Sequence, residues 1–400
     1  MSTVIAAHRE ESIMDDLDAI TEESLVAKGG RKWSSFPGSL GAFIAEMDFG
    51  VAPVIRQALT EIDARDLYGY APTSLVSDLR SATSAFCADR YGWQFPASHV
   101  HLASDVLAAF IGVLEHLTPA GTPIVLPTPA YMPFFDVAAV TGRELIEVPM
   151  LRTETDWQVD LDAVAAALTP GATLVLCNPH NPIGKVYSAQ EMQAIAEVVE
   201  AAGARVFSDE IHAPLVYDPA HHVPYASLSA VTAGHTATAT AASKAFNIPG
   251  LKCAQLILTN PHDRETWARK GHFVSGAAAN PGILATTAAY SQGGDWLAEI
   301  TAYLKGNRDV LTDLLTSELP NAAYIPPDGT YLAWLDLRGY GFDSGLSAHF
   351  NEAAKVAVTE GRLCGKVGAG HVRINFALPR PLLEEAVRRL VAAVRRGPHD

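Results

Sequence analysis

The sequence contains little cysteine, and its few cysteines lie far apart. Its 400 residues include four, Cys87, Cys177, Cys253 and Cys364, with no Cys-x-x-Cys pair and no cluster of cysteine with histidine. Disulfide frameworks and structural zinc sites need closely spaced ligands, so the pattern predicts neither. We expect buried, reduced thiols, as in a cytoplasmic protein.

Positive charge is also scarce. The chain has 29 lysines and arginines against 44 aspartates and glutamates, which gives a formal net charge of −15, and no basic run is longer than two residues. Nucleic acids and anionic membranes require a positive protein surface, so neither is an expected partner. A local positive pocket for one phosphate group remains compatible with this composition.

Long apolar runs are absent. Residues 1–20 include several acidic side chains and lack the apolar core of a signal peptide. No stretch approaches the roughly 18 apolar residues that a membrane span requires. The composition, 48% hydrophobic and 18% charged, is typical of a globular enzyme. The sequence therefore predicts a soluble, cytoplasmic protein.

The length and the order of patterns predict an α/β protein with two domains. A chain of 400 residues exceeds what one hydrophobic core usually serves. We expect an N-terminal arm over 1–45 that contributes to the smaller domain, a large domain over 46–285, and a small α+β domain over 286–400. The arm is expected to contain one helix, over 12–27.

Short apolar strands alternate with helices in the predicted large domain. The expected strands cover 99–103, 122–126, 144–149, 173–177, 205–208, 235–239 and 255–258. Helical patterns such as 106–117 and 188–202 lie between them, which predicts a mainly parallel sheet sandwiched by helices. The predicted small domain has a long helix from about 281 to 315, interrupted near Gly293, two strands over 331–337 and 371–375, and a final helix over 382–395.

Polar and aromatic side chains follow four of the predicted strands, at the sheet edge where α/β proteins bind ligands. They are Tyr131, Asn181, Asp209 and Lys244. Taken singly, they are typical of a core aromatic, a turn residue, a helix cap and a surface lysine. Together they match the needs of pyridoxal phosphate: an amine for its aldehyde, a carboxylate for its ring nitrogen, an amide for its hydroxylate and an aromatic ring for stacking.

Between residues 45 and 375 the chain resembles the fold-type I, pyridoxal-phosphate-dependent class I/II aminotransferase superfamily. It is most similar to the branch of cystathionine β-lyases and cysteine-S-conjugate β-lyases, which is related to the maltose-regulon modulator. The motifs that carry the resemblance are AEMDF at 45–49, TPAY at 128–131, NPIGK at 181–185, SDEIH at 208–212, SKAFNIP at 243–249, YLAWLD at 331–336 and VRIN at 372–375. The resemblance implies a fold like that of aspartate aminotransferase.

The resemblance also implies roles for the residues around the cofactor ring. Lys244 would form the Schiff base with pyridoxal phosphate and move protons. Asp209 would pair with the pyridinium nitrogen, Asn181 would contact the ring hydroxylate, and Tyr131 would stack on the ring. His212 stands where many aminotransferases have a tyrosine that binds the hydroxylate.

A second group of residues is implied in binding the cofactor phosphate. Ser243 and Lys252 would reach it, together with the helix start at 104–106, formed by Ser104, Asp105 and Val106. A carboxylate beside a phosphate is unfavourable, so we expect Asp105 to cap the helix instead. Tyr70 matches a tyrosine that reaches the phosphate of the neighbouring subunit, which implies a homodimer with shared sites.

The substrate is expected to be an amino acid, because Arg373 matches an arginine that binds the substrate α-carboxylate. His212 favours a C–S β-lyase that cleaves cystathionine or another cysteine S-conjugate to a thiol, pyruvate and ammonia. An aminotransferase is the main alternative. A natural-product enzyme for a large S-conjugate, by elimination or by oxygen-dependent decarboxylation and deamination, and a catalytically inactive relative are others. The complete set of cofactor residues argues against the inactive relative.

The pair His221-His222 is the one metal-like feature of the sequence. No carboxylate or cysteine pattern accompanies it, so the sequence predicts a solvated loop and no metal site.

Overall fold

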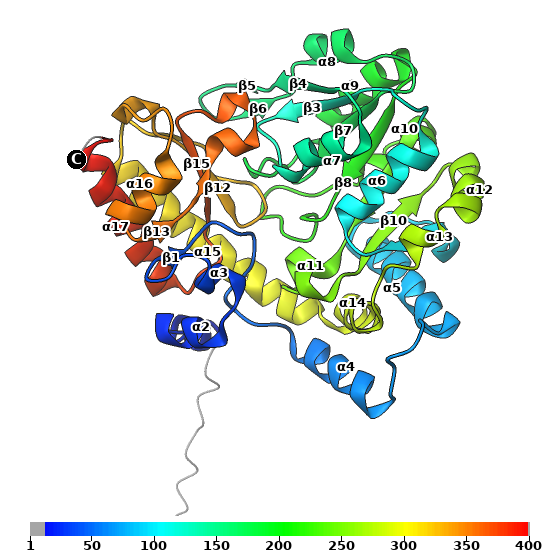
Figure 1. The fold of residues 1–400 in the computed structure, drawn as a ribbon, viewed down its shortest axis with the longest axis horizontal. Helices are drawn as coiled ribbons and strands as arrows, with labels where there is room; N and C mark the ends of the chain where they lie inside the picture. Colours follow the sequence, from blue (N-terminus) through cyan, green and yellow to red (C-terminus); the bar gives the residue numbers. More distant parts are fainter. Residues whose placement is uncertain (1–12, 399–400) are drawn as a thin grey trace, which may run out of the picture.

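A computed structural model describes residues 13–398, and a seven-stranded sheet lies at the centre of its larger part (Figure 1). Strands β9, β8, β7, β3 and β4 are parallel, and β10 is antiparallel to its neighbours β9 and β2. In spatial order the strands are β2 (Val100–Ala103), β10 (Ala254–Leu258), β9 (Thr236–Thr240), β8 (Arg205–Asp209), β7 (Thr173–Cys177), β3 (Ile124–Thr128) and β4 (Leu145–Pro149). The predicted α/β class with a mainly parallel sheet is confirmed.

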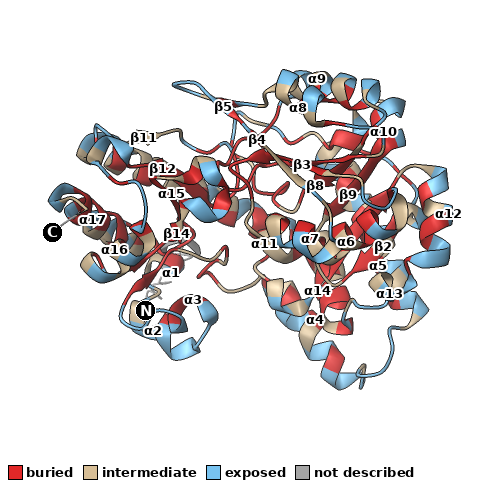
Figure 2. Cartoon of the chain, turned by 45° about the horizontal axis from the view of Figure 1, so that its top comes forward, coloured by how far each residue is buried: buried red, intermediate tan, exposed pale blue. Residues whose placement is uncertain are grey.

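Helices cover both faces of this sheet because successive strand residues point to opposite sides. In β7, Leu174 and Leu176 pack in one core with helices α8 (Leu161–Ala167) and α9 (Ala189–Ala201). The alternate residues of β7 pack in a second core. That core holds α6 (Val106–Leu117), α7 (Pro133–Thr141) and α12 (Pro261–Lys270). Figure 2 shows buried residues along the strands and exposed residues on the outer sides of the helices.

A smaller, four-stranded sheet lies beside the first in a separate cluster of helices. Its strands are β11 (Ala323–Tyr324), β12 (Leu332–Asp336), β15 (His371–Asn375) and β14 (Thr359–Glu360). Helices α15 (Gly294–Glu318), α16 (Leu346–Ala353) and α17 (Arg380–Arg396) pack in the same core. The N-terminal strand β1 (Leu40–Gly41) pairs with β13 (Val356–Ala357) in this region. The exact division at 45 and 285 stays a prediction.

The N-terminal region differs from its prediction. The structure has α1 (Ile13–Asp18) and α2 (Glu22–Lys28) where one helix over 12–27 was expected, and residue 12 lies outside the described residues. The break occurs because the Thr21 side chain accepts a hydrogen bond from the Ser24 N–H and so begins a new helix. Short α3 (Arg31–Ser34), α4 (Pro53–Ala64) and α5 (Thr73–Tyr91) follow.

The predicted interruption near Gly293 is confirmed, since α14 (Asn280–Gln292) ends and α15 begins there. A Cβ atom on Gly293 would lie 2.6 Å from both the Ala289 carbonyl oxygen and the Phe246 ring. Glycine therefore lets this helix junction approach the segment that carries Lys244. Within residues 13–398, none of the helices has the length and apolarity that crossing a membrane would require.

The aromatic core beneath the sheet provides a test of the fold. Phe207 of β8 is fully buried and stacks on Phe110 at a centroid distance of 4.3 Å. We expect Phe207→Ala to lower the free energy of unfolding by about 3–5 kcal/mol, because it leaves a cavity. Urea denaturation followed by circular dichroism measures the change. The control Val140→Ala, at a side chain that is 74% exposed, should change it by less than about 0.5 kcal/mol, and equal effects of the two variants would contradict this packing.

Candidate active site

A pocket at the carboxyl ends of the parallel strands brings together most of the predicted site residues. It has a volume of about 190 Å³ and adjoins a larger cavity of about 790 Å³, with which it shares Tyr131, Lys244 and Lys252. The predicted residues that line one or both cavities are Ser104, Asp105, Val106, Tyr131, Asn181, Asp209, His212, Ser243, Lys244, Lys252 and Arg373. Of the predicted set, only Tyr70 lies elsewhere.

Lys244 lies in the one-turn helix α11 (Ala242–Ala245), directly after β9. Its Nζ donates a hydrogen bond to the carbonyl oxygen of Ala45, at 2.8 Å. Burial and, to a lesser extent, the nearby Arg373 charge lower the pKa of Lys244 to about 8, against the opposing charges of Glu46 and Asp209. At pH 7 about a tenth of this amine is therefore uncharged and nucleophilic, far more than for an ordinary lysine.

Asp209 ends β8, between the ends of β7 and β9, and is only 3% exposed. Burial, with a smaller contribution from the Glu210 charge, raises the pKa of its carboxyl to about 7, although the Ile211 N–H and the Lys244 charge oppose the shift. The Ile211 N–H donates to Asp209 Oδ1 at 3.1 Å. Few nearby groups stabilise the negative charge of this buried carboxylate, so a cationic group bound in the pocket would be a favourable partner.

Arg373 joins the small sheet to this pocket. One guanidinium nitrogen donates to Asn181 Oδ1 at 3.1 Å, and the other donates to the Phe43 carbonyl at 2.8 Å and to Thr359 Oγ1 at 3.2 Å. Its buried Nε has no hydrogen-bond partner within the part of the chain that the structure describes. A fixed guanidinium with a spare donor is suited to a carboxylate ligand.

The opposite end of the pocket combines a helix N-terminus, Ser243 and a lysine. Asp105 caps α6, because its Oδ1 accepts the Ala108 N–H at 2.9 Å. Its Oδ2 pairs with Lys252 Nζ at 3.1 Å. The expectation that Asp105 caps the helix is confirmed, and Lys252 balances its charge beside a site suited to an anion.

Tyr131 and His212 form further parts of the pocket wall. The Tyr131 ring packs edge-on against Phe134 at 5.5 Å. His212 is 2% exposed, and burial holds its pKa well below the ordinary value, so its ring is neutral. Its Nδ1 has no hydrogen-bond partner among residues 13–398. The neutral ring can therefore still donate or accept one hydrogen bond within the site.

Tyr70 does not join the pocket of its own chain. It lies fully exposed in the turn between α4 and α5. Asn280 fixes this turn by donating hydrogen bonds to the carbonyls of Leu67 and Gly69, at 3.0 and 2.9 Å. The predicted contact of Tyr70 with the site of a second subunit stays a prediction.

The histidine pair lies in a loop, as predicted, and His221 is exposed, but the predicted solvation is wrong for His222. This residue is only 7% exposed, and its Nε2 lies 3.0 Å from Glu210 Oε2. Glu210 also accepts hydrogen bonds from Ser208 Oγ at 2.8 Å and from the Tyr225 N–H at 3.1 Å. The partner carboxylate lies in the SDEIH motif, so the pairing depends on tertiary structure that the local sequence does not reveal.

Several lining residues were missed by sequence reasoning. Glu46 lies in the AEMDF motif, which carried the family resemblance but did not indicate that this residue lines the site. Thr359 and Phe43 reach Arg373 from distant segments, and Arg31 lines the larger cavity from α3. No sequence pattern marks these three residues.

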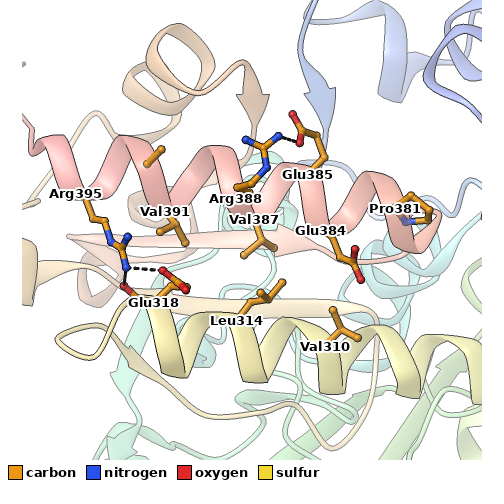
Figure 3. Close-up of a pocket in the computed structure, with 11 residues that line it drawn as sticks. Val310, Leu314, Glu318, Pro381, Glu384, Glu385, Val387, Arg388, Val391 and Arg395 are labelled. Atoms are coloured by element: carbon orange, nitrogen blue, oxygen red, sulfur yellow. Dashed lines mark hydrogen bonds and ion pairs between the residues drawn. The ribbon is translucent and has the colours of Figure 1, made fainter.

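A different groove lies between α15 and α17, away from these residues (Figure 3). Its floor is apolar, with Leu314 and Val387 facing each other. Four of the charges on its rim are paired, Glu318 with Arg395 and Glu385 with Arg388, and the remaining carboxylate, Glu384, is exposed. It lacks a nucleophile and a buried charge, so the strand-end pocket is the candidate active site.

Comparison with known proteins agrees with the geometry of the site. A family model described as aminotransferase class I and II matches residues 44–390. The cystathionine β-lyase of Corynebacterium glutamicum is 34% identical, over 93% of this chain and 98% of that protein. The cystathionine β-lyase PatB of Bacillus subtilis is 31% identical, over 89% and 92%. The crystal structure of cystalysin from Treponema denticola, which contains pyridoxal 5'-phosphate, has a TM-score of 0.87 and 26% identity, over 94% of this chain and 98% of that one.

The lowered pKa of Lys244 can be measured by reductive methylation of ligand-free protein with formaldehyde. We expect the rate at Lys244, followed by peptide mass spectrometry, to rise with pH to a midpoint of about 8, because only the neutral amine reacts. Loss of the modified peptide in Lys244→Arg identifies the site. A midpoint near 10.5, the ordinary value for lysine, would contradict the environment described.

Proposed function

Because the chain belongs to the family of class I and II aminotransferases, we propose that it is a pyridoxal-phosphate-dependent C–S β-lyase. It cleaves cystathionine or another cysteine S-conjugate, with water, to a thiol, pyruvate and ammonia. The observation that carries the proposal is a pair of adjoining cavities that share Lys244, one lined by the buried Asp209 carboxylate and the other by Arg373 with its spare donor. Relatives with the name cystathionine β-lyase, at 31–34% identity over most of the chain, support the lyase reaction.

The residues of the pocket fit the cofactor. When bound, pyridoxal phosphate supplies an aldehyde that reacts with amines and a ring that accepts electrons from the substrate Cα. Asp209 is placed to hold a protonated ring nitrogen, and that cation would in turn favour the ionised form of this buried carboxylate. Asn181 offers an amide to the ring hydroxylate, and Tyr131 offers an aromatic face.

The phosphate of the cofactor fits the opposite end of the pocket. The backbone N–H groups at the start of α6, around 104–106, present the positive end of a helix dipole. Ser243 adds a hydroxyl group and Lys252 adds a cation. The pairing of Asp105 with the Ala108 N–H and with Lys252 keeps that carboxylate occupied at the helix end.

The substrate is placed by Arg373, which binds its α-carboxylate. The Lys244 amine then accepts the Cα proton, which its lowered pKa allows near neutral pH. Loss of this proton and of the sulfur group from Cβ breaks the C–S bond, and the thiolate leaves with a proton. Water then releases the remaining three-carbon unit as pyruvate and ammonia.

We also propose a homodimer in which Tyr70 of each subunit serves the site of the other. The full exposure of Tyr70, on a turn fixed by Asn280, supports this arrangement. A cytoplasmic location stays our prediction, supported by four cysteines that are buried and unbonded to one another.

The reaction is tested with purified enzyme, pyridoxal phosphate and L-cystathionine, without any keto acid. We expect pyruvate and thiol in equal amounts. Lys244→Ala should lower kcat by more than about a hundredfold, because it removes the base. Lys270→Ala, at an exposed lysine of α12, is the matched control and should retain activity. Amino transfer to an added keto acid, with no pyruvate formed, would contradict the proposal and favour an aminotransferase.

The shared site is tested by complementation. Tyr70→Ala and Lys244→Ala variants with different tags are co-expressed, and the mixed dimer is isolated through both tags. One of its two sites then carries both changes and the other carries neither, so we expect about half the wild-type activity per dimer. A mixed dimer as inactive as the Lys244→Ala parent, or a monomer in analytical ultracentrifugation, would contradict the sharing of sites.

A further inference from the structure

Two charged side chains of opposite sign, Arg31 and Glu46, line the larger cavity next to the reaction site. We propose that they form a second substrate subsite, which binds a zwitterionic amino-acid head group at the far end of the S-substituent. Arg31 binds the distal carboxylate and Glu46 binds the distal ammonium group. The inference rests on the proposed lyase function and specifies the substrate class: cysteine S-conjugates that carry a second amino acid, as cystathionine does.

The cavity has the extent that such a substrate needs. Its volume is about 790 Å³, and it continues from Lys244 and the buried Arg373 to the exposed Arg31 and Phe36. Phe36 packs edge-on against Phe43 at a centroid distance of 5.0 Å, so part of the wall is aromatic. An S-linked chain can therefore lie along an apolar wall while its end reaches the charged residues.

The other charged side chains that line the cavity already have bonding partners or proposed roles. Arg373 and Lys244 serve the cysteine half of the substrate, and Lys252 pairs with Asp105. Glu360 Oε2 accepts a hydrogen bond from the Ser347 N–H, at 2.9 Å, near the start of α16, whereas its buried Oε1 has no partner among the described residues. Neither Arg31 nor Glu46 forms an ion pair through its side chain with any residue from 16 to 398, although the Glu46 charge raises the pKa of Lys244. Arg31 and Glu46 are thus free to bind a ligand, and the Glu360 oxygen offers a further acceptor in the same cavity.

Arg31 and Glu46 are held in fixed positions relative to each other. Lys32, the neighbour of Arg31, forms a buried ion pair with Asp48 at 2.9 Å, and its Nζ also donates to the Glu46 carbonyl at 3.1 Å. Trp33 Nε1 donates to Asp48 Oδ1 at 2.9 Å. Helix α3 is therefore docked onto the segment that carries Glu46, so the backbones of both residues are fixed, which reduces part of the entropic cost of binding.

The chemistry of the pair selects its ligand. A guanidinium binds a carboxylate through two parallel hydrogen bonds, and a carboxylate binds an ammonium group through a charge-assisted hydrogen bond. A neutral S-alkyl chain in the same cavity would gain apolar contact with the wall but would leave both charges without a partner. The structure thus favours a zwitterionic end over an alkyl or aryl end.

Four substrates that share the same three-carbon chain on sulfur distinguish the contact with Arg31 from the contact with Glu46. They are L-cystathionine, S-(3-carboxypropyl)-L-cysteine without the distal ammonium, S-(3-aminopropyl)-L-cysteine without the distal carboxylate, and S-propyl-L-cysteine without either. For each variant of the holoenzyme, kcat/KM is measured by pyruvate release and expressed relative to S-propyl-L-cysteine. This ratio isolates the distal contacts from any general effect of a substitution on catalysis.

We expect the wild-type ratio to be highest for cystathionine. Arg31→Gln should lower the ratios for cystathionine and the carboxypropyl substrate by about tenfold, mainly through KM, and Arg31→Lys should restore part of the loss. Glu46→Gln should lower the ratios for cystathionine and the aminopropyl substrate by a similar factor. Glu299→Gln, at an exposed carboxylate of α15 outside the cavity, is the control and should leave all four ratios as in the wild type.

The failures of the two proposals are distinguishable. If the wild type releases pyruvate from all four substrates with equal kcat/KM, the distal subsite is wrong and the lyase function stands. The subsite is also wrong if Arg31→Gln and Glu46→Gln leave every ratio unchanged. If none of the four substrates yields pyruvate, the lyase function itself is wrong.

Discussion

The site depends on how the backbone of residues 45–48 is held. The carbonyl of Ala45 accepts hydrogen bonds from Lys244 at 2.8 Å and from Tyr331 at 3.0 Å. Asn375 donates to the carbonyl of Glu46 at 2.7 Å. Asn247 binds both the N–H and the carbonyl of Met47, each at 2.9 Å. One irregular segment is thus bonded to Lys244 of α11, to Tyr331 just before β12 and to Asn375 of β15, because its backbone groups need partners once they are buried.

This constraint explains how two separately packed sheets can build one site. Lys244 and Asp209 follow strands of the large sheet, whereas Arg373 lies in β15 of the small sheet. Asn181 accepts a hydrogen bond from Arg373 and so joins the two sheets directly. Burying these groups has an electrostatic cost. Burial raises the pKa of Asp209 and lowers that of Lys244, so both groups are destabilised in their charged forms. A bound cofactor with a cationic ring and an aldehyde relieves both effects, which is why such strain can persist in the folded protein.

Site residues that lie at the ends of predicted strands could be found from the sequence, whereas residues placed by tertiary contacts could not. Asp209 and Lys244 could be found because each directly follows an apolar strand, and strand ends meet at one edge. Arg31 could not be found, because tertiary contacts of its neighbours Lys32 and Trp33, above all with Asp48, bring α3 to the cavity. The antiparallel direction of β10 could not be predicted either, since an apolar strand pattern carries no information on whether neighbouring strands run parallel or antiparallel.

A fold shared by lyases and aminotransferases leaves the choice of reaction to a few groups beyond the cofactor set. Asp209, Asn181 and Lys244 suit both reactions, because each begins with loss of the Cα proton. Elimination additionally needs a sulfur substituent aligned for departure, and that alignment comes from binding its far end. A neutral His212 adds no charge near the ring. The cavity wall with Arg31 and Glu46 does add charges, and the same cavity is lined by Lys244. In the proposed subsite, binding of the far end of the S-substituent would orient the C–S bond, so the residues that select the substrate would also favour the lyase outcome.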